Sequence, residues 1–286
     1  MEYTLILNYY NKSKELLIKQ LNAISKQTIK PKLIWGCFMG CEDDELLHTY
    51  QEITKDWDNA CFIDSDYNFK YIGRYQLALT APTEIIVMLD DDRIPNPQYC
   101  ECMIKIVRNE ECLVQQYGWQ LDKRPGGEIQ LKKQKIPRPV DFVGKYSSPY
   151  EECNSRYRKE TPILAQADYL CGGMVFRKSS LKYLFQEDIY TTATGEDIMF
   201  CLRCKKNNIP VYIYRPNVEK NPNQVLNHFE NNSFTCDNDE VILCRTNIIK
   251  HELSKIKEIK KEKNLPRDKG PGLKDILNPR IKKPNS

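Results

Sequence analysis

The chain has 286 residues and a mass of 33.6 kDa, enough for one large α/β domain or two small ones with a sizeable core. Its composition, 41% hydrophobic and 29% charged, excludes a fibrous, wholly disordered or disulfide-stapled chain. The net charge is +4, and the last 32 residues hold 11 basic against 4 acidic residues. A nucleic-acid binder would spread basic charge over a folded face, so we expect no nucleic-acid partner.

The twelve cysteines fall singly along apolar runs and form no disulfide framework. The one C-x-x-C, from Cys201 to Cys204, lies in a helical pattern and lacks the second Cys or His pair of a zinc site. Free thiols indicate a reducing compartment. We also expect neither a signal peptide nor a transmembrane segment, and hence a cytoplasmic protein.

Strands alternate with helices through the first 119 residues. Short apolar runs predict the strands, and periodic apolar residues predict the helices between them. The predicted strands are residues 5–7, 32–39, 60–63, 84–89 and 113–119, and the predicted helices are residues 15–27, 42–55, 74–80 and 98–108. This alternation predicts an α/β fold with a doubly wound, mixed but mostly parallel sheet flanked by helices.

A long excursion over residues 120–162 follows, and loops of this length are uncommon unless they are functional. Order returns with strands in residues 165–177 and 211–214, a helix at 196–206 and a final helix from 239 to about 263. We therefore predict three parts. These are a catalytic domain over 1–238 (nucleotide-binding half 1–112, acceptor half 113–238), a C-terminal helix over 239–264 and a basic, flexible tail over 265–286.

Three consecutive carboxylates, Asp90, Asp91 and Asp92, follow the continuous apolar run of residues 85–89. Such a run is typical of a buried parallel strand, and open α/β sheets place ligands at the C-terminal ends of their strands. Close like charges repel unless a proton or a cation neutralises them. Asp90 and Asp92 would point to one side of an extended chain, and their oxygens suit Mg²⁺ or Mn²⁺. The other interpretation is a solvated acidic turn.

A second acidic pair, Glu196 and Asp197, follows Gly195 at the start of a predicted helix. Helix capping alone would explain the pair. A helix start also holds a carboxylate rigidly, ionised and facing outward, as a general base requires. Between the two acidic groups lie Gly172 and Gly173, which either let a ligand approach the backbone or form the turn into a strand.

Five segments in this order resemble the GT-A glycosyltransferases, and within them the family-two type of inverting enzymes. They are residues 8–12 (the first-strand turn), 68–78 (similar to N-x-G-x-x-x-A), 89–92 (similar to D-x-D), 169–181, and 195–203 (similar to G-E-D with L-x-R). The resemblance covers about residues 3–215. Two features depart from it. The second strand lacks the terminal Asp that commonly contacts the base, which leaves base recognition open, and no Q-x-x-R-W occurs, so we do not expect a processive membrane synthase.

The resemblance implies a GT-A (Rossmann-like) fold and transfer of a sugar from a nucleoside diphosphate sugar, with a UDP-sugar as first choice, to a hydroxyl of a glycan, protein or lipid-linked acceptor. It implies Asp197 as the base and Glu196 as the group that orients the acceptor, although these roles could be exchanged. Inversion is implied, but residue types do not fix it, so retention stays open. The donor side would comprise Asn8, Tyr10, Asn11, Arg74, Asp90 and Asp91, and the acceptor side Gly172, Gly173 and Trp119.

The same resemblance implies a metal, Mn²⁺ or Mg²⁺, held by Asp92, Asp90 and a late histidine. His228 lies in such a late segment, with an ordinary surface histidine as the other interpretation. Two further alternatives stay open for the whole protein. One is a metal-dependent nucleotidyltransferase, although residues 8–14 contain no glycine for a phosphate loop. The other is a non-catalytic sugar-nucleotide-binding protein. The basic tail could make peripheral contact with anionic membranes.

Overall fold

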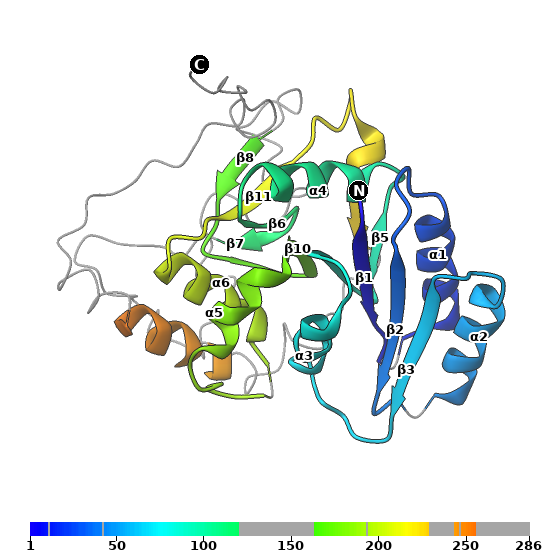
Figure 1. Cartoon of the computed structure of the whole chain (residues 1–286), viewed down its shortest axis with the longest axis horizontal. Helices are drawn as coiled ribbons and strands as arrows, with labels where there is room; N and C mark the ends of the chain where they lie inside the picture. Colours follow the sequence, from blue (N-terminus) through cyan, green and yellow to red (C-terminus); the bar gives the residue numbers. More distant parts are fainter. Residues whose placement is uncertain are drawn as a thin grey trace, which may run out of the picture.

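The computed structural model describes residues 1–10, 12–41, 43–119, 163–192, 194–228, 243–245 and 247–255. Its central feature is an eight-stranded sheet with the order β3-β2-β1-β4-β10-β6-β11-β8 (Figure 1). The strands are β1 (Tyr3–Asn8), β2 (Leu33–Met39), β3 (Ala60–Ser65), β4 (Ile85–Asp90), β6 (Leu113–Gln115), β8 (Ile163–Gln166), β10 (Gly173–Arg177) and β11 (Val211–Arg215). Strands β3, β2, β1 and β4 are parallel, whereas β10 is antiparallel to both β4 and β6. The mixed, mostly parallel sheet predicted from the sequence is therefore confirmed.

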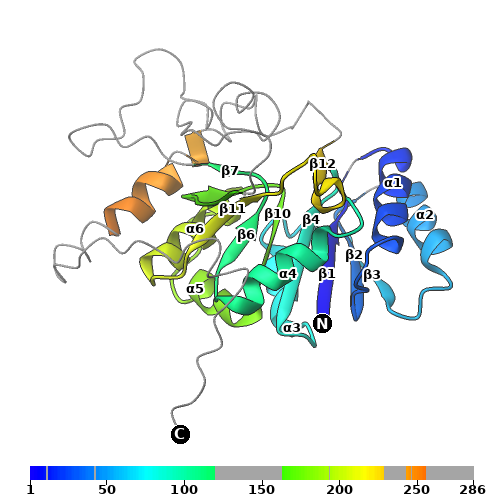
Figure 2. The ribbon, with the colours of Figure 1, turned by 90° about the horizontal axis from the view of Figure 1, so that it is seen from above.

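Six labelled α-helices of the described residues flank this sheet. They are α1 (Lys14–Ser25), α2 (Asp44–Thr54), α3 (Gly73–Thr80), α4 (Tyr99–Asn109), α5 (Leu181–Phe185) and α6 (Glu196–Lys206). Local sequence explains where two of them begin, because the side chains of Ser13 and Asp43 accept hydrogen bonds from the first turns of α1 and α2. A further helical segment at residues 247–255 lies beside α5 and α6 in both views (Figures 1 and 2).

The sheet separates two cores because successive strand residues point to opposite faces. In β1, Leu5 and Leu7 pack with α1, α2 and α4, whereas Ile6 packs on the other face with α3, α5, α6 and the segment 247–255. Strand β4 follows the same alternation, with Val87 in the first core and Met88 in the second. Each such buried aliphatic side chain contributes about 1.5–3 kcal/mol. Strand β4 is thus fixed on both faces, and so is the position of its C-terminal end.

Two small pairs of strands lie at the edge of the main sheet. Strand β12 (Leu226–His228) pairs antiparallel with β5 (Arg93–Pro95), and β7 (Gly118–Trp119) pairs with β9 (Tyr169–Leu170). The predicted strand at residues 113–119 is therefore two strands, β6 and β7. The first of these pairs brings the backbone of His228 opposite Arg93, next to the three aspartates.

Several predictions fall partly outside the described residues. The excursion at 120–162 and the tail at 265–286 lie there entirely. The final helix predicted for 239–264 is observed at 243–245 and 247–255. Cys201 and Cys204 are buried in α6 and form no disulfide. Among the described residues, no helix has both the length and the apolar character needed to cross a bilayer.

Candidate active site

The first aspartate of the triplet lies at the C-terminal end of β4, beside the end of β1. Asn8 pairs with Asp90 in the parallel register of these two strands. The turn after β4 is fixed by Gln20 of α1, whose Nε2 donates to the backbone carbonyls of Asp90 and Arg93, both at 2.8 Å. Gln20 is fully buried, so this amide holds the turn without competition from water. The strand end therefore presents its carboxylates from a rigid support.

Arg74 of α3 connects the two acidic groups that the sequence singled out. Its Nη1 forms an ion pair with Oδ1 of Asp90, and its Nη2 donates to Oε1 of Glu196 at 3.1 Å. The Arg74 side chain is 4% exposed and that of Glu196 is 6% exposed, so solvent screens this contact little. The planar guanidinium presents several N–H donors in a fixed fork, which lets its two Nη atoms contact two carboxylates on different elements. Arg74, expected on the donor side, thus acts directly on Asp90 and Glu196.

Glu196 and Asp197 occupy the first turn of α6, immediately after Gly195. Gly195 has a left-handed backbone (φ 79°), which favours glycine, and Asp197 Oδ1 accepts a hydrogen bond from Ile198 N at 2.8 Å. Both carboxylates are buried, with 5% and 8% exposure. The expectation that this helix start faces outward is therefore wrong. The reason is packing, because Ile248 of the segment 247–255 lies against Gly195.

Burial changes the protonation of this pair. Desolvation, together with the charge of Asp197, raises the pKa of Glu196 to about 7, although Arg74 and Arg245 oppose the rise. Desolvation also raises the pKa of Asp197, against the charges of Arg245 and Arg74. A carboxylate that titrates near neutral pH is suited to accept a proton from a hydroxyl. The sequence predicted ionised carboxylates at this helix start, whereas burial raises the pKa of both and so favours their protonated forms.

The other two aspartates, Asp91 and Asp92, are held by different contacts. Burial raises the pKa of Asp91 to about 8, where Lys12 opposes the rise and Asp90 and Asp92 add to it. Tyr10 N donates to Asp91 Oδ2 at 3.4 Å, so the expected donor-side residue Tyr10 does lie beside the triplet. Asp92 is 9% exposed, and its Oδ1 lies 3.2 Å from Nε of Arg93.

Gly172 and Gly173 have positive φ angles of 77° and 96°, and both are packed by neighbours. A Cβ on Gly172 would lie 2.3 Å from Nε of Arg93, and a Cβ on Gly173 would lie 2.2 Å from the carbonyl oxygen of Met88. The glycines therefore let Arg93 and β4 approach the backbone. Arg93 also lies over the Tyr117 ring, with 4.3 Å between its Cζ and the ring centroid. Sequence reasoning missed Arg93, although it directly follows the aspartate triplet.

The oxygen donors at the end of β4 fit a divalent cation of the Mg²⁺ or Mn²⁺ type. Three carboxylates follow one another along the chain there, and burial, together with the charges of Asp90 and Asp92, raises the pKa of Asp91. The described residues contain no preassembled group of three or more acidic, His or Cys side chains. A cation would therefore need further ligands, which a bound diphosphate can supply. The side chain of His228 lies outside the described part, but the pairing of β12 with β5 brings its backbone to this end of the sheet.

Arg245 is the second residue that sequence reasoning missed. It comes from the C-terminal part of the chain, where residues 243–245 are helical, and its Nε donates to the buried Thr194 Oγ1 at 3.2 Å. Its charge favours the ionised forms of both Glu196 and Asp197. The sequence carries no local signal for this contact, since 48 residues separate Arg245 from Asp197.

Besides His228, two predicted site residues cannot be fully placed. Asn11 lies outside the described residues. Trp119 belongs to β7, where its backbone pairs with Tyr169, but its side chain also lies outside the described part. The structure thus brings together Asn8, Tyr10, Arg74, Asp90, Asp91, Asp92, Glu196 and Asp197 at one edge of the sheet.

No known family profile matches the chain, and no curated protein is similar to it in sequence. Solved structures are similar in fold. GalNAc-T7, crystallised with UDP, GalNAc and Mn²⁺, shares 10% identity at a TM-score of 0.57, over 89% of this chain and 49% of that one. S. aureus TarS shares 19% identity at a TM-score of 0.46, over 75% of this chain and 36% of that one. TarS 1–349 shares 18% identity at a TM-score of 0.46, over 75% of this chain and 60% of that one.

These neighbours are GT-A glycosyltransferases, and the chain spans less than two thirds of the length of each. At 10% identity, the likeness to GalNAc-T7 shows the fold. The GT-A fold class predicted from the sequence is therefore confirmed.

Proposed function

We propose that the chain is a glycosyltransferase that moves a sugar from a nucleoside diphosphate sugar to a hydroxyl acceptor. One observation carries this proposal: Arg74 joins the strand-end carboxylate Asp90 to Glu196 at the start of α6. This bridge supports the proposal because it links the acidic strand end to a buried carboxylate pair whose pKa values are both raised by burial. Transfer of a glycosyl group needs these two elements, one at the leaving diphosphate and one at the attacking hydroxyl.

On the donor side, we assign Asn8, Tyr10, Asn11, Asp90 and Asp91 to the nucleotide. A UDP-sugar is the first donor to test, in keeping with the UDP in the GalNAc-T7 structure of the same fold. Asp92, Asp90 and His228 would hold a divalent cation, Mn²⁺ or Mg²⁺. Such a cation, when bound, neutralises charge on the departing diphosphate.

On the acceptor side, Asp197 takes the proton of the acceptor hydroxyl. As that oxygen forms its bond to the anomeric carbon, the bond to the diphosphate oxygen breaks on the opposite face, which gives inversion. Glu196, held by Arg74, orients the hydroxyl, and the two carboxylates could exchange roles. Gly172, Gly173 and Trp119 are the assigned sugar-side residues. A glycan, protein or lipid-linked acceptor all fit this chemistry, and we propose a cytoplasmic location.

The experiment titrates Mn²⁺ against UDP- and GDP-sugars while thermal shift and donor hydrolysis are measured. We expect nucleotide to stabilise the protein only when metal is present, and Asp92→Asn to lose this coupling. Asp58→Asn, an exposed carboxylate on another loop, is the matched control and should keep it. Coupling that survives in Asp92→Asn would refute the metal assignment. Coupling without any sugar transfer or hydrolysis would instead indicate a non-catalytic binding protein, and nucleotidyl transfer would indicate the alternative enzyme class.

A further inference from the structure

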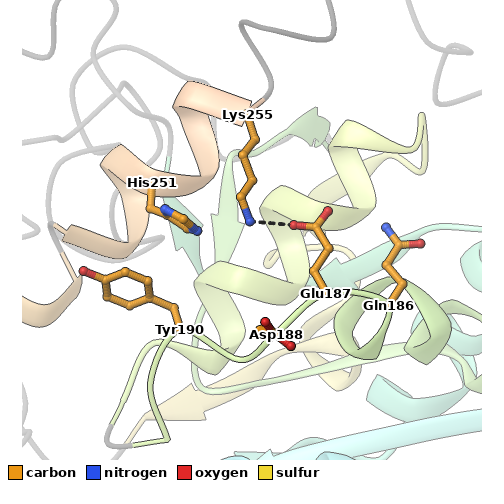
Figure 3. A pocket seen from close by; sticks show the side chains of 6 residues that line it. All are labelled: Gln186, Glu187, Asp188, Tyr190, His251 and Lys255. Carbon is orange, nitrogen blue, oxygen red and sulfur yellow. Dashed lines mark hydrogen bonds and ion pairs between the residues drawn. The ribbon is translucent and has the colours of Figure 1, made fainter.

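A second hollow lies away from the aspartates, between the loop after α5 and the segment 247–255. Its volume is about 550 Å³, and Figure 3 shows the six residues that line it: Gln186, Glu187, Asp188, Tyr190, His251 and Lys255. The loop that forms one wall continues directly to Gly195 and the acidic pair. The helix that forms the other wall packs Ile248 on Gly195, and His251 follows one turn later, about 5 Å along the axis. The hollow is therefore a neighbour of the candidate active site.

The walls of this hollow carry balanced charge. Glu187 forms ion pairs with Lys255 at 2.7 Å and with Lys206, and these ammonium groups lower the pKa of Glu187 to about 2 against the effect of burial. Asp188 adds a second carboxylate, and Lys255 in the lining and Lys206 behind it supply two positive charges, so the carboxylates are matched in number by ammonium groups. An anionic ligand would meet Asp188, and a cationic ligand would meet the lysines. The electrostatics therefore favour a neutral, polar ligand.

The floor of the hollow is rigid. Arg203 is fully buried, and its guanidinium donates to the carbonyls of Leu184 at 2.6 Å, Glu187 at 3.0 Å and Asp188 at 2.7 Å. Its Nε also donates to Glu252 at 3.0 Å, which connects the loop to the segment 247–255. One side chain thus fixes both walls, so the cavity is held open without a ligand.

An aromatic surface completes the hollow. The Tyr190 ring lies 5.0 Å from the His251 ring at an angle of 39°, and the residue is 47% exposed. A half-exposed tyrosine that is held in place by a neighbouring ring offers an apolar face beside polar groups. Gln186 supplies amide donors and an acceptor, and Asp188 supplies carboxylate acceptors. An apolar ring face together with several donors and acceptors matches the faces and hydroxyl groups of a sugar ring.

We propose that this hollow binds sugar units of a neutral oligosaccharide acceptor, remote from the hydroxyl that reacts. This inference rests on the proposed function, and it narrows the acceptor to a glycan of more than one unit. A chain seated on Tyr190 would lie alongside the loop that leads to Asp197, so its end could reach the carboxylate pair.

The test uses an array of defined neutral and phosphate-bearing glycans, from single sugars to longer oligosaccharides, probed with the full chain. We expect the wild type to bind neutral oligosaccharides and Tyr190→Ala to bind them about tenfold more weakly or worse. Tyr67→Ala removes another exposed tyrosine, on the loop after β3, and should bind like the wild type. A melting temperature of Tyr190→Ala within about 3 °C of the wild type confirms that the variant folds.

Three outcomes would overturn the proposal: no glycan bound by the wild type, equal binding by Tyr190→Ala, or binding of phosphate-bearing glycans alone. The Mn²⁺ and UDP-sugar thermal shift is measured on the same variants and separates the two proposals. Tyr190→Ala should keep that shift. If the wild type shows no such shift, the proposed function fails, while the array still decides whether the hollow binds glycans.

Discussion

Nη2 of Arg74 lies 3.1 Å from Oε1 of Glu196, across 122 positions of the sequence. The same guanidinium contacts Asp90, so one side chain fixes the relative position of α3, β4 and α6. Buried ion pairs stabilise little in total because desolvation opposes them, but removal of one partner leaves a stranded charge. This contact therefore fixes the relative position of the acidic residues more than it stabilises the fold. Its removal should still reduce the free energy of unfolding, because it leaves a buried charge unpaired.

Arg74→Ala should reduce the free energy of unfolding by about 3–5 kcal/mol, because Glu196 loses its nearest cation. Adding Glu196→Gln to this variant should restore part of the loss, since the stranded charge is then absent. Urea denaturation of the wild type, both single variants and the double variant gives the coupling energy. Strictly additive effects would contradict a direct bridge. Arg74→Lys is the conservative control, and because it keeps the positive charge it should lose less stability than Arg74→Ala.

The raised pKa of Glu196 predicts how stability depends on pH. The folded state keeps the Glu196 proton up to about pH 7, whereas the unfolded chain loses it near 4.5. The contribution of Glu196 to the free energy of unfolding is therefore fully present below about pH 4.5. It falls by on the order of 3 kcal/mol as the pH rises to about 7. Denaturation midpoints across this range measure the fall. Glu196→Gln should remove the Glu196 part of this fall, while Asp91, whose pKa is raised from 3.8 to about 8, keeps its own decline over the same range and on to about pH 8.

Arg245 should control the pH dependence of activity. Under the proposed function the base must be ionised, so we expect the rate to rise with pH as the acidic pair loses its proton. Arg245→Gln removes a charge that favours the ionised forms of Glu196 and Asp197, so the rising limb should move to higher pH. Arg245→Lys keeps the charge and should leave the limb near its original position. An unchanged profile in Arg245→Gln would show that Arg245 acts only through its contact with Thr194.

Gly195→Ala should disturb the contact between α6 and the segment 247–255. The new Cβ would lie 2.6 Å from Cδ1 of Ile248, and the φ of 79° costs an L-residue about 1–2 kcal/mol. Thermal unfolding should show a loss of at least that size. When Gly195→Ala is made in the Ile248→Ala background, the steric part of the loss should vanish and the part due to the backbone angle should persist. A double variant as unstable as the sum of both singles would argue against the contact.

Arg203→Met should be among the most destabilising single changes in α6. It leaves the carbonyls of Leu184, Glu187 and Asp188 without their donor, and it strands the buried Glu252. We expect a loss of about 3–5 kcal/mol in chemical denaturation. A second substitution, Glu252→Leu, should recover part of this loss because it removes the buried charge. If Arg203→Met unfolds like the wild type, these hydrogen bonds add nothing to stability.

The sequence predicts the parts of the site that depend on local pattern. The apolar run before Asp90 places that residue at a strand end, and Gly195 marks the start of α6, at the residues where the structure has them. Both signals arise from short-range effects, namely continuous burial of a parallel strand and the left-handed backbone of a helix cap.

The missed features depend on contacts between distant segments. Helical periodicity in the C-terminal part indicates a helix but does not tell which surface that helix covers. The sequence therefore could not predict that Arg245 lies near the acidic pair. The outward orientation expected for Asp197 was wrong for the same reason, because Ile248 covers the start of α6. Gly172 likewise appeared equally suited to a ligand or a turn, and only the structure shows Arg93 in the space beside it.

The position of Arg245 has a practical consequence for expression of the protein. A polypeptide shortened to end after β12 would still contain every strand of the main sheet and all three aspartates. It would lack the guanidinium beside the acidic pair and the wall that carries His251. Under the proposed function, such a shortened protein would bind nucleotide but differ in turnover and pH response, so inactivity of the fragment would say little about the full chain.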